Sequence, residues 1–168
     1  GIELPGEPLL PKELQYTTDR TKAIKDDYRR TLSNNAILSS ELKNGWTLFP
    51  HQKRAILMGL MKRRLILALD MGLGKTLIGC VWSKAFQLTF EALKIFVVCP
   101  VSLKTEWKRT AENTTGLKVE DENGGAKKSS LDLKICSWAK IPTEVDSSVK
   151  NYVVVFDEAH SCPIYTST

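Results

Sequence analysis

The sequence predicts an α/β fold in which a mainly parallel sheet is flanked by helices. Apolar runs of strand length alternate along residues 46–168 with amphipathic stretches of helical period. The runs hold few polar residues, which indicates strands buried on both faces, and strands joined through helices pair in parallel. With 168 residues, 42% of them hydrophobic, the chain is long enough for a compact domain.

The first 45 residues predict a helical and extended segment appended to this domain. Three of the seven prolines fall within residues 1–12. Ile24, Tyr28 and Leu32 then recur at every fourth position, which predicts a narrow helical stripe. Lys43-Asn44-Gly45 is a turn signal. We therefore place a boundary near Gly45, with an N-terminal extension at residues 1–45 and the α/β domain at residues 46–168.

Three stretches of the domain predict helices. Pro50 suits a first helical turn, and apolar residues follow it with helical period. Residues 77–86 present a wide apolar stripe on one helix face. Ser102 is expected to cap a third helix reaching position 109, in which Leu103 and Trp107 share a face. We interpret Trp107 as a core residue.

Four apolar runs predict strands, at residues 65–69, 95–99, 131–136 and 152–156. Three of them are rich in β-branched or aromatic side chains, which favour strands. Residues 120–130 combine acidic residues, Asn-Gly-Gly and Lys-Lys-Ser-Ser, and predict a mobile surface loop. The order strand, helix, strand, helix is that of right-handed parallel crossovers.

Charge is unevenly distributed along the chain. The net charge is +5, and residues 46–113 hold eleven Lys and Arg against four Asp and Glu. This excess is compatible with a phosphate-bearing partner, and a solvated basic face is the alternative. No apolar run approaches the roughly 20 residues that span a bilayer.

The cysteines predict a reducing compartment. Cys80, Cys99 and Cys136 lie within apolar runs, where a thiol behaves as a small core residue, and no Cys-x-x-Cys pair occurs. A zinc site is disfavoured, because the remaining soft ligands are Cys162, His51 and His160.

The most informative stretch is Asp70-Met71-Gly72-Leu73-Gly74-Lys75-Thr76, between an apolar run and an amphipathic stretch. Glycines allow backbone N–H groups to turn toward an anion, and a helix N-terminus adds partial positive charge. Lys75 supplies a full charge, and the Thr76 hydroxyl suits Mg²⁺. Leu69 stands where the general phosphate-loop pattern has glycine, so the match is to a variant.

A second candidate site, Asp157-Glu158-Ala159-His160, directly follows the last apolar run. Ends of strands are where open α/β sheets present chemistry. Asp157 suits a magnesium ligand, and Glu158 suits the base that orients an attacking water. A helix N-terminus with favourable acidic charges is the alternative for the motif taken alone.

These motifs together resemble the SWI/SNF-type ATPases of helicase superfamily two. The resemblance rests on Leu48-Phe49-Pro50-His51-Gln52, on Met71-Gly72-Leu73-Gly74-Lys75-Thr76, on Val97-Val98-Cys99-Pro100-Val101-Ser102-Leu103 with Trp107, and on Asp157-Glu158-Ala159-His160. It implies the first RecA-like lobe of a DNA-dependent ATPase that uses ATP and Mg²⁺ to translocate on duplex DNA. Implied partners are duplex DNA, a second RecA-like lobe, and chromatin or replication-fork proteins.

The resemblance also implies roles for single residues. Gln52 reads the adenine edge, Glu158 acts on the water, and His160 couples nucleotide state to the lobe interface. The glycine loop and the acidic motif are implied to bind the phosphates and the metal. The segment after the second apolar run is implied to contact DNA. In full, the implied cofactor ligands are Gln52, Gly72, Leu73, Gly74, Lys75 and Thr76, the magnesium ligands Thr76 and Asp157, and the DNA contacts Ser102, Leu103 and Lys104.

Two alternatives stay open. One is the lobe of a superfamily-two RNA helicase, and the other is an interaction module that has kept the phosphate loop and lost the chemistry. Because the resemblance implies an arginine from a second lobe, we expect this chain alone to bind nucleotide with little turnover. The expected location is the nucleus in a eukaryote and the cytoplasm otherwise.

Overall fold

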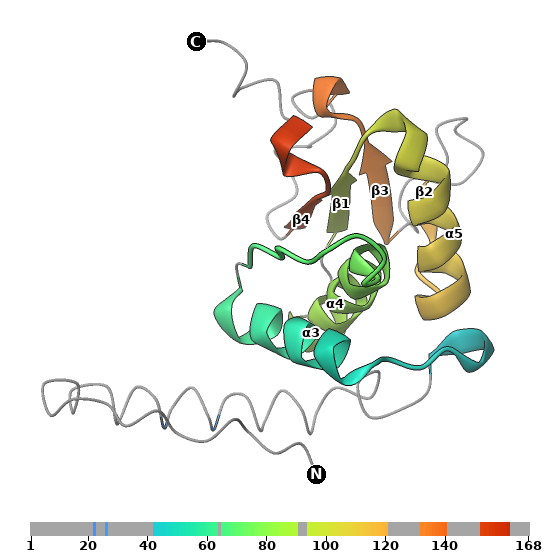
Figure 1. Ribbon diagram of the computed structural model, residues 1–168. Helices are drawn as coiled ribbons and strands as arrows, with labels where there is room; N and C mark the ends of the chain where they lie inside the picture. Colours follow the sequence, from blue (N-terminus) through green and yellow to red (C-terminus); the bar gives the residue numbers. More distant parts are fainter. Residues whose placement is uncertain are drawn as a thin grey trace, which may run out of the picture.

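The computed structural model describes residues 22, 26, 42–63, 65–90, 94–120, 132–140 and 152–161 (Figure 1). Within them a parallel sheet lies above a layer of helices, which confirms the predicted α/β fold. The proposed N-terminal extension lies almost wholly outside these residues, as does the loop predicted at 120–130. No helix among the described residues has the length and apolar character to cross a membrane.

The sheet contains β1 (Lys94–Val98), β2 (Val119–Glu120), β3 (Leu133–Cys136) and β4 (Tyr152–Phe156) in the order β2-β3-β1-β4. Each adjacent pair is parallel, and Ile95 of β1 lies between Leu133 and Val153. In β1 only Lys94 is not buried, as expected of a central strand covered on both faces. Parallel pairing brings the carboxyl ends of all four strands to one edge.

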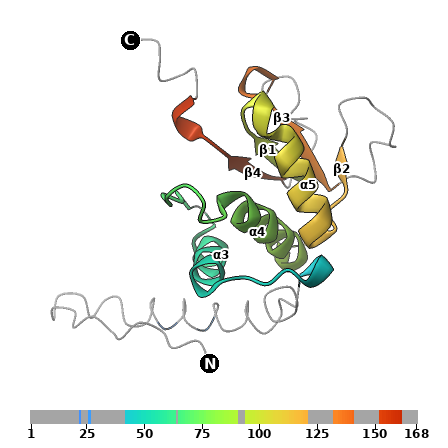
Figure 2. The ribbon, with the colours of Figure 1, turned by 45° about the vertical axis from the view of Figure 1, so that its right-hand side comes forward.

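Three α-helices are described: α3 (Pro50–Lys62), α4 (Lys75–Phe90) and α5 (Lys104–Thr115). The described residues also form short 3-10 turns: η2 (Lys43–Gly45), η3 (Val101–Leu103), η5 (Trp138–Lys140) and η6 (Ala159–Ser161). Pro50 occupies the first turn of α3, as predicted. Figure 2 shows α4 between α3 and α5, so α4 is the central helix of this layer.

Two apolar clusters hold the layers together. One lies between the sheet and α5 and includes Trp107, which is 2% exposed, so the core interpretation of this residue is confirmed. The other lies between α3 and α4, where Ile56 and Val81 are fully buried. The stripe predicted at residues 77–86 faces this second cluster through Leu77, Ile78, Val81 and Ala85.

The strand predicted at residues 65–69 is wrong, because residues 65–70 have no regular secondary structure. A strand forms where a neighbouring strand accepts its ladder hydrogen bonds. Within the described part of the chain no strand lies beside this segment. A cavity with Leu65, Ile66 and Leu67 on one side and β4 on the other separates the two. Ile66 is accordingly 94% exposed.

Two further predictions need correction. Ser102 does not cap the third helix; it lies within η3, and α5 begins after Leu103 and runs to Thr115. The N-cap residue is Leu103, whose side chain has no hydrogen-bonding group, so the cap has no side-chain hydrogen bond. The sequence also gave no sign of β2, which has only two residues.

Candidate active site

The glycine loop turns sharply between residues 70 and 75. Gly72 has φ +82° and Gly74 has φ +77°, in the left-handed region that glycine enters without strain. The chain then enters α4, whose first bonds include Ile78 N–H donating to the Gly74 carbonyl at 3.0 Å. The loop therefore ends at the N-terminus of the central helix, where unpaired N–H groups favour an anion.

Gln52 of α3 holds this loop in place. Its Oε1 accepts the Phe49 N–H at 3.0 Å, and its Nε2 donates to the Leu73 carbonyl at 3.3 Å. A Cβ added to Gly74 would lie 2.6 Å from the same Nε2. Gln52 is 4% exposed, which excludes an exposed helical glutamine. Its adenine-reading role stays a prediction, since both ends of the amide bond to the backbone here.

The Lys75 side chain is hydrogen-bonded to the backbone that leads into the loop. Its Nζ donates to the Leu69 carbonyl at 3.1 Å. Leu69 is the residue at which the loop departs from the general phosphate-loop pattern. The bond is a single one, and an ammonium has three donors. The ammonium therefore keeps donors for an anion bound at the loop. Thr76, the next residue, is half-buried in the first turn of α4.

The acidic motif follows β4 at the carboxyl edge of the sheet. Asp157 N–H donates to the Val98 carbonyl at 2.8 Å, which extends the β1–β4 pairing by one residue. Its Oδ1 accepts the Glu158 N–H at 3.0 Å, and its Oδ2 accepts Trp107 Nε1–H at 2.8 Å. Both carboxylate oxygens therefore have a fixed donor, which sets the orientation of the group.

Glu158 adopts an unusual backbone conformation. Its φ is +52°, in the left-handed region that costs non-glycine residues of the order of 1–2 kcal/mol. Its Oε2 lies 3.3 Å from His160 Nε2, and the His160 side chain is 77% exposed. Such strain at a strand end is typical of functional positions.

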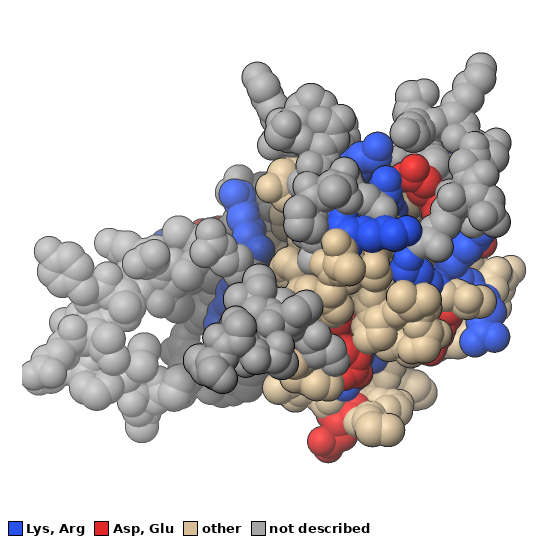
Figure 3. All heavy atoms as spheres, turned by 90° about the horizontal axis from the view of Figure 1, so that it is seen from above, with Lys and Arg blue, Asp and Glu red and all other residues tan. Residues whose placement is uncertain are grey.

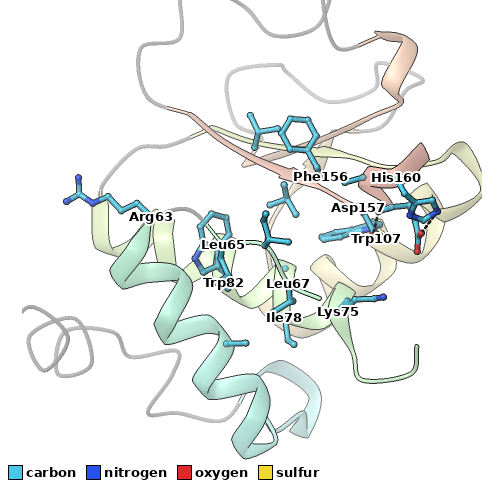
Figure 4. Close-up of a pocket in the computed structure, with 17 residues that line it drawn as sticks. Arg63, Leu65, Leu67, Lys75, Ile78, Trp82, Trp107, Phe156, Asp157 and His160 are labelled. Carbon is cyan, nitrogen blue, oxygen red and sulfur yellow. Dashed lines mark hydrogen bonds and ion pairs between the residues drawn. The ribbon is translucent and has the colours of Figure 1, made fainter. Parts of the chain in front are cut away.

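One cavity of about 580 Å³ brings the two motifs together. Lys75 from the start of α4 lines it on one side, and Asp157 and His160 line it on the other (Figure 4). Glu158 also lines the cavity. Trp107 lies beside Asp157 in the same view. Gln52, Gly72, Leu73, Gly74 and Thr76 do not line this cavity. A cation on one wall and carboxylates on the other suit a phosphate bridged to a divalent metal.

The donor set fits Mg²⁺ better than a softer metal. The implied ligands Thr76 and Asp157 offer a hydroxyl and a carboxylate oxygen, and Mg²⁺ is usually bound by one or two protein oxygens together with substrate phosphates. In the described part of the chain, no group of three or more His, Cys, Asp or Glu could hold a metal ion. A metal at this site would therefore depend on ligands that the substrate brings.

The residues implied in DNA contact lie together at a different place. Ser102 and Leu103 belong to η3, and Lys104 begins α5, directly beyond the carboxyl end of β1. Ser102 is exposed, whereas Leu103 and Lys104 are half-buried. Figure 3 views this carboxyl edge from above and shows Lys and Arg side chains gathered there, with Asp and Glu among them.

The described cysteines are free and buried, as predicted. Burial raises the pKa of the Cys99 thiol to about 11, with a further rise from nearby Asp157. Burial raises the pKa of Cys80 still more strongly. Both thiols therefore stay protonated at neutral pH.

A parallel α/β sheet with a glycine loop at a helix start and an acidic motif at a strand end defines the RecA-like, ATP-binding lobe of helicase-type proteins. The chain belongs to the protein family described as type III restriction enzyme, res subunit, whose pattern matches residues 45–166. None of the curated proteins compared with it matches.

Solved structures similar to this chain include two helicase-type proteins. The UvsW helicase from bacteriophage T4 matches with 21% identity and a TM-score of 0.61, covering 82% of this chain and 51% of UvsW. The Sulfolobus solfataricus SWI2/SNF2 ATPase core in complex with dsDNA matches with 25% identity and a TM-score of 0.54. That match covers 68% of this chain and 26% of the Sulfolobus chain. The chain thus spans about half of the first protein and a quarter of the second.

The sequence did not reveal how Trp107 is connected to the acidic motif. Its indole N–H bonds to a residue 50 positions away. Trp107 and Leu103 share a helix face as predicted, and nothing in the helical period indicates which end of the indole meets a polar partner. The one sequence signal for a functional role of Trp107 was its place among the residues that resemble the SWI/SNF-type ATPases.

Proposed function

We propose that this chain is the ATP-binding lobe of a DNA-dependent ATPase that couples ATP hydrolysis to translocation on duplex DNA. The observation that supports it best is the shared cavity, which Lys75 of the glycine loop lines together with Asp157 and Glu158. A phosphate chain bound by the loop would extend toward these carboxylates. The matched family and the helicase-type fold agree with this proposal.

Each loop residue has a distinct task in the proposed site. The backbone N–H groups of Gly72, Leu73 and Gly74 would bind the phosphates, because glycine at 72 and 74 allows the left-handed turns that direct successive N–H groups toward an anion. Lys75 would exchange the Leu69 carbonyl for a phosphate oxygen, a stronger acceptor for an ammonium. Gln52 would support the loop and, with a change of partners, contact the adenine.

The carboxylates would act on the metal and the water. Asp157 and the Thr76 hydroxyl would hold Mg²⁺, which when bound neutralises charge on the phosphates. Glu158 would orient the attacking water and accept its proton, since its side chain lines the cavity. His160 contacts Glu158 and is exposed, so it is placed to couple this carboxylate to a second RecA-like lobe.

The choice of duplex DNA rests on two supports. The Sulfolobus SWI2/SNF2 core was solved with dsDNA, and η3 carries the residues implied in DNA contact on an edge where Lys and Arg gather. Ser102, Leu103 and Lys104 would contact a strand through backbone N–H groups and the lysine charge. We place the complete protein among SWI/SNF-type remodellers or annealing helicases, with chromatin or fork proteins as partners, in the nucleus or the cytoplasm.

A titration with fluorescently labelled ATP and Mg²⁺ tests nucleotide binding. Lys75→Ala should weaken binding roughly 10- to 100-fold, the effect of losing one hydrogen bond to a charged group. Lys84→Ala is the matched control, because Lys84 lies on the same helix and bonds to Gln87 instead. Equal binding by wild type and Lys75→Ala would refute the glycine loop as the site. Absence of binding by the folded wild type would favour the inactive interaction module.

The chemistry is tested in a longer version of the protein with both lobes. Glu158→Gln should retain nucleotide binding and reduce turnover by at least a hundredfold, because the amide cannot accept the proton of the water. Duplex DNA should stimulate turnover more than RNA does. The opposite preference would favour the RNA helicase alternative.

A further inference from the structure

Trp107 meets the acidic motif through a single hydrogen bond from a buried indole. Its Nε1–H donates to Asp157 Oδ2 at 2.8 Å, and the side chain is 2% exposed (Figure 4). The other oxygen, Oδ1, accepts the Glu158 backbone N–H. One donor therefore comes from the motif itself, and the other comes from α5, on a different layer of the fold.

The far edge of the same indole presses against α4. A Cβ added to Gly79 would lie 2.5 Å from Trp107 Cη2 and 3.2 Å from Cζ3, so only glycine leaves room for the ring. Gly79 lies one turn after Lys75 on the helix that follows the glycine loop. Glycine within a helix destabilises it relative to alanine, and the position of the indole explains its presence here. Trp107 thus spans the distance between the loop helix and Asp157.

We infer that Trp107 is a positioning residue: its indole N–H fixes the Asp157 carboxylate in the orientation that binds Mg²⁺. The inference rests on the proposed function and adds a residue that acts through Asp157. Donors that orient a ligating carboxylate typically change metal affinity 10- to 100-fold when removed. The same bond joins the metal ligand to α5, the helix that begins at the segment proposed to contact DNA.

The bond can be observed without nucleotide. The chain has four tryptophans, and the indole ¹H–¹⁵N resonance absent from Trp107→Phe identifies the one from Trp107. Its proton should exchange slowly with solvent in the wild type. Asp157→Ala should shift this resonance and accelerate the exchange at least tenfold, whereas an unchanged resonance would show that the bond is absent in solution.

The role of the bond is tested through Mg²⁺ dependence. Labelled ATP is titrated with Mg²⁺ and with EDTA, and the ratio of the two affinities is compared among variants. Trp107→Phe keeps an aromatic ring and removes the donor, so Mg²⁺ affinity should fall about tenfold while binding in EDTA is unchanged. Trp82→Phe is the matched control, because Trp82 Nε1 has no hydrogen-bond partner among the described residues.

The outcomes separate the two proposals. An equal Mg²⁺ dependence in Trp107→Phe and Trp82→Phe would overturn the positioning role, and a purely structural tryptophan would give that result. Absence of nucleotide binding by the wild type would overturn the proposed function, on which the positioning role rests. Should Trp107→Phe fail to fold, Gly79→Ala displaces the same indole and favours the helix, and it should lower Mg²⁺ affinity in the same direction.

Discussion

Replacing each loop glycine by alanine probes how Gln52 holds the phosphate loop. Gly72 and Gly74 have nearly the same backbone angle, with φ +82° and +77°. Their surroundings differ. A Cβ on Gly72 meets nothing within 4 Å, whereas a Cβ on Gly74 would lie 2.6 Å from Gln52 Nε2. The two substitutions therefore share the backbone strain, and only Gly74→Ala also displaces the amide.

The expected losses of stability follow from these contacts. Left-handed alanine costs about 1–2 kcal/mol, and the reduced entropy of the unfolded chain returns roughly half of that. We expect Gly72→Ala to lower the free energy of unfolding by about 1 kcal/mol. Gly74→Ala should lose a further 1–2 kcal/mol, because the hydrogen bond from Gln52 Nε2 to the Leu73 carbonyl is broken in a buried place.

Urea unfolding followed by circular dichroism measures both losses. The double variant Gln52→Ala/Gly74→Ala completes a thermodynamic cycle, and in it the additional cost of Gly74→Ala should disappear, since the clashing amide is gone. Equal destabilisation by Gly72→Ala and Gly74→Ala would refute the reasoning. So would a Gly74→Ala cost that persists at full size after Gln52 is removed.

Two further predictions concern groups outside the nucleotide site. Because the pKa of Cys99 is raised to about 11 and that of Cys80 is raised further, both thiols should resist iodoacetamide at pH 8 until urea is added, as mass spectrometry would show. Between the ordinary thiol pKa near 9.0 and about 11, the unfolded chain releases the Cys99 proton first, so stability should fall as pH rises through this window. Reaction in the native state as fast as in urea would contradict this burial. Asp132 accepts Gln87 Nε2–H at 2.9 Å and Lys118 N–H at 3.0 Å, so Asp132→Ala should lower the urea midpoint, at a cost of about 1–3 kcal/mol, without changing nucleotide affinity. An unchanged midpoint would show that these bonds add nothing to stability.

Local patterns were enough to predict helices and strands whose own spacing of apolar residues shows which face is buried. The stripe at residues 77–86 predicted α4, and the run at 152–156 predicted β4 with the bounds that the structure shows. Residues 65–69 are as apolar as a strand, yet a strand also needs a neighbour, and that condition is not contained in a local run. For the same reason the two residues of β2 gave no signal.

Part of the candidate site could be predicted from the sequence, but its contacts could not. Lys75, Asp157 and Glu158 were expected to act together, and they line one cavity. The bonds that determine their present orientation join residues far apart in the chain, such as Gln52 to Leu73 and Trp107 to Asp157. Side-chain hydrogen bonds of this kind depend on the packing of whole helices, which no spacing rule contains.

The position of β4 in the sheet order has a consequence for handling the protein. β4 pairs with β1 on one side, and on its other side the described residues supply no strand. Tyr152 and Phe156 of β4 are 47% and 52% exposed. Ile66 lines the cavity that Phe156 also lines. Open apolar edges of sheets pair with other chains and drive self-association. The average molar mass that light scattering gives for this chain should therefore rise with concentration, and Val154→Lys should suppress the rise.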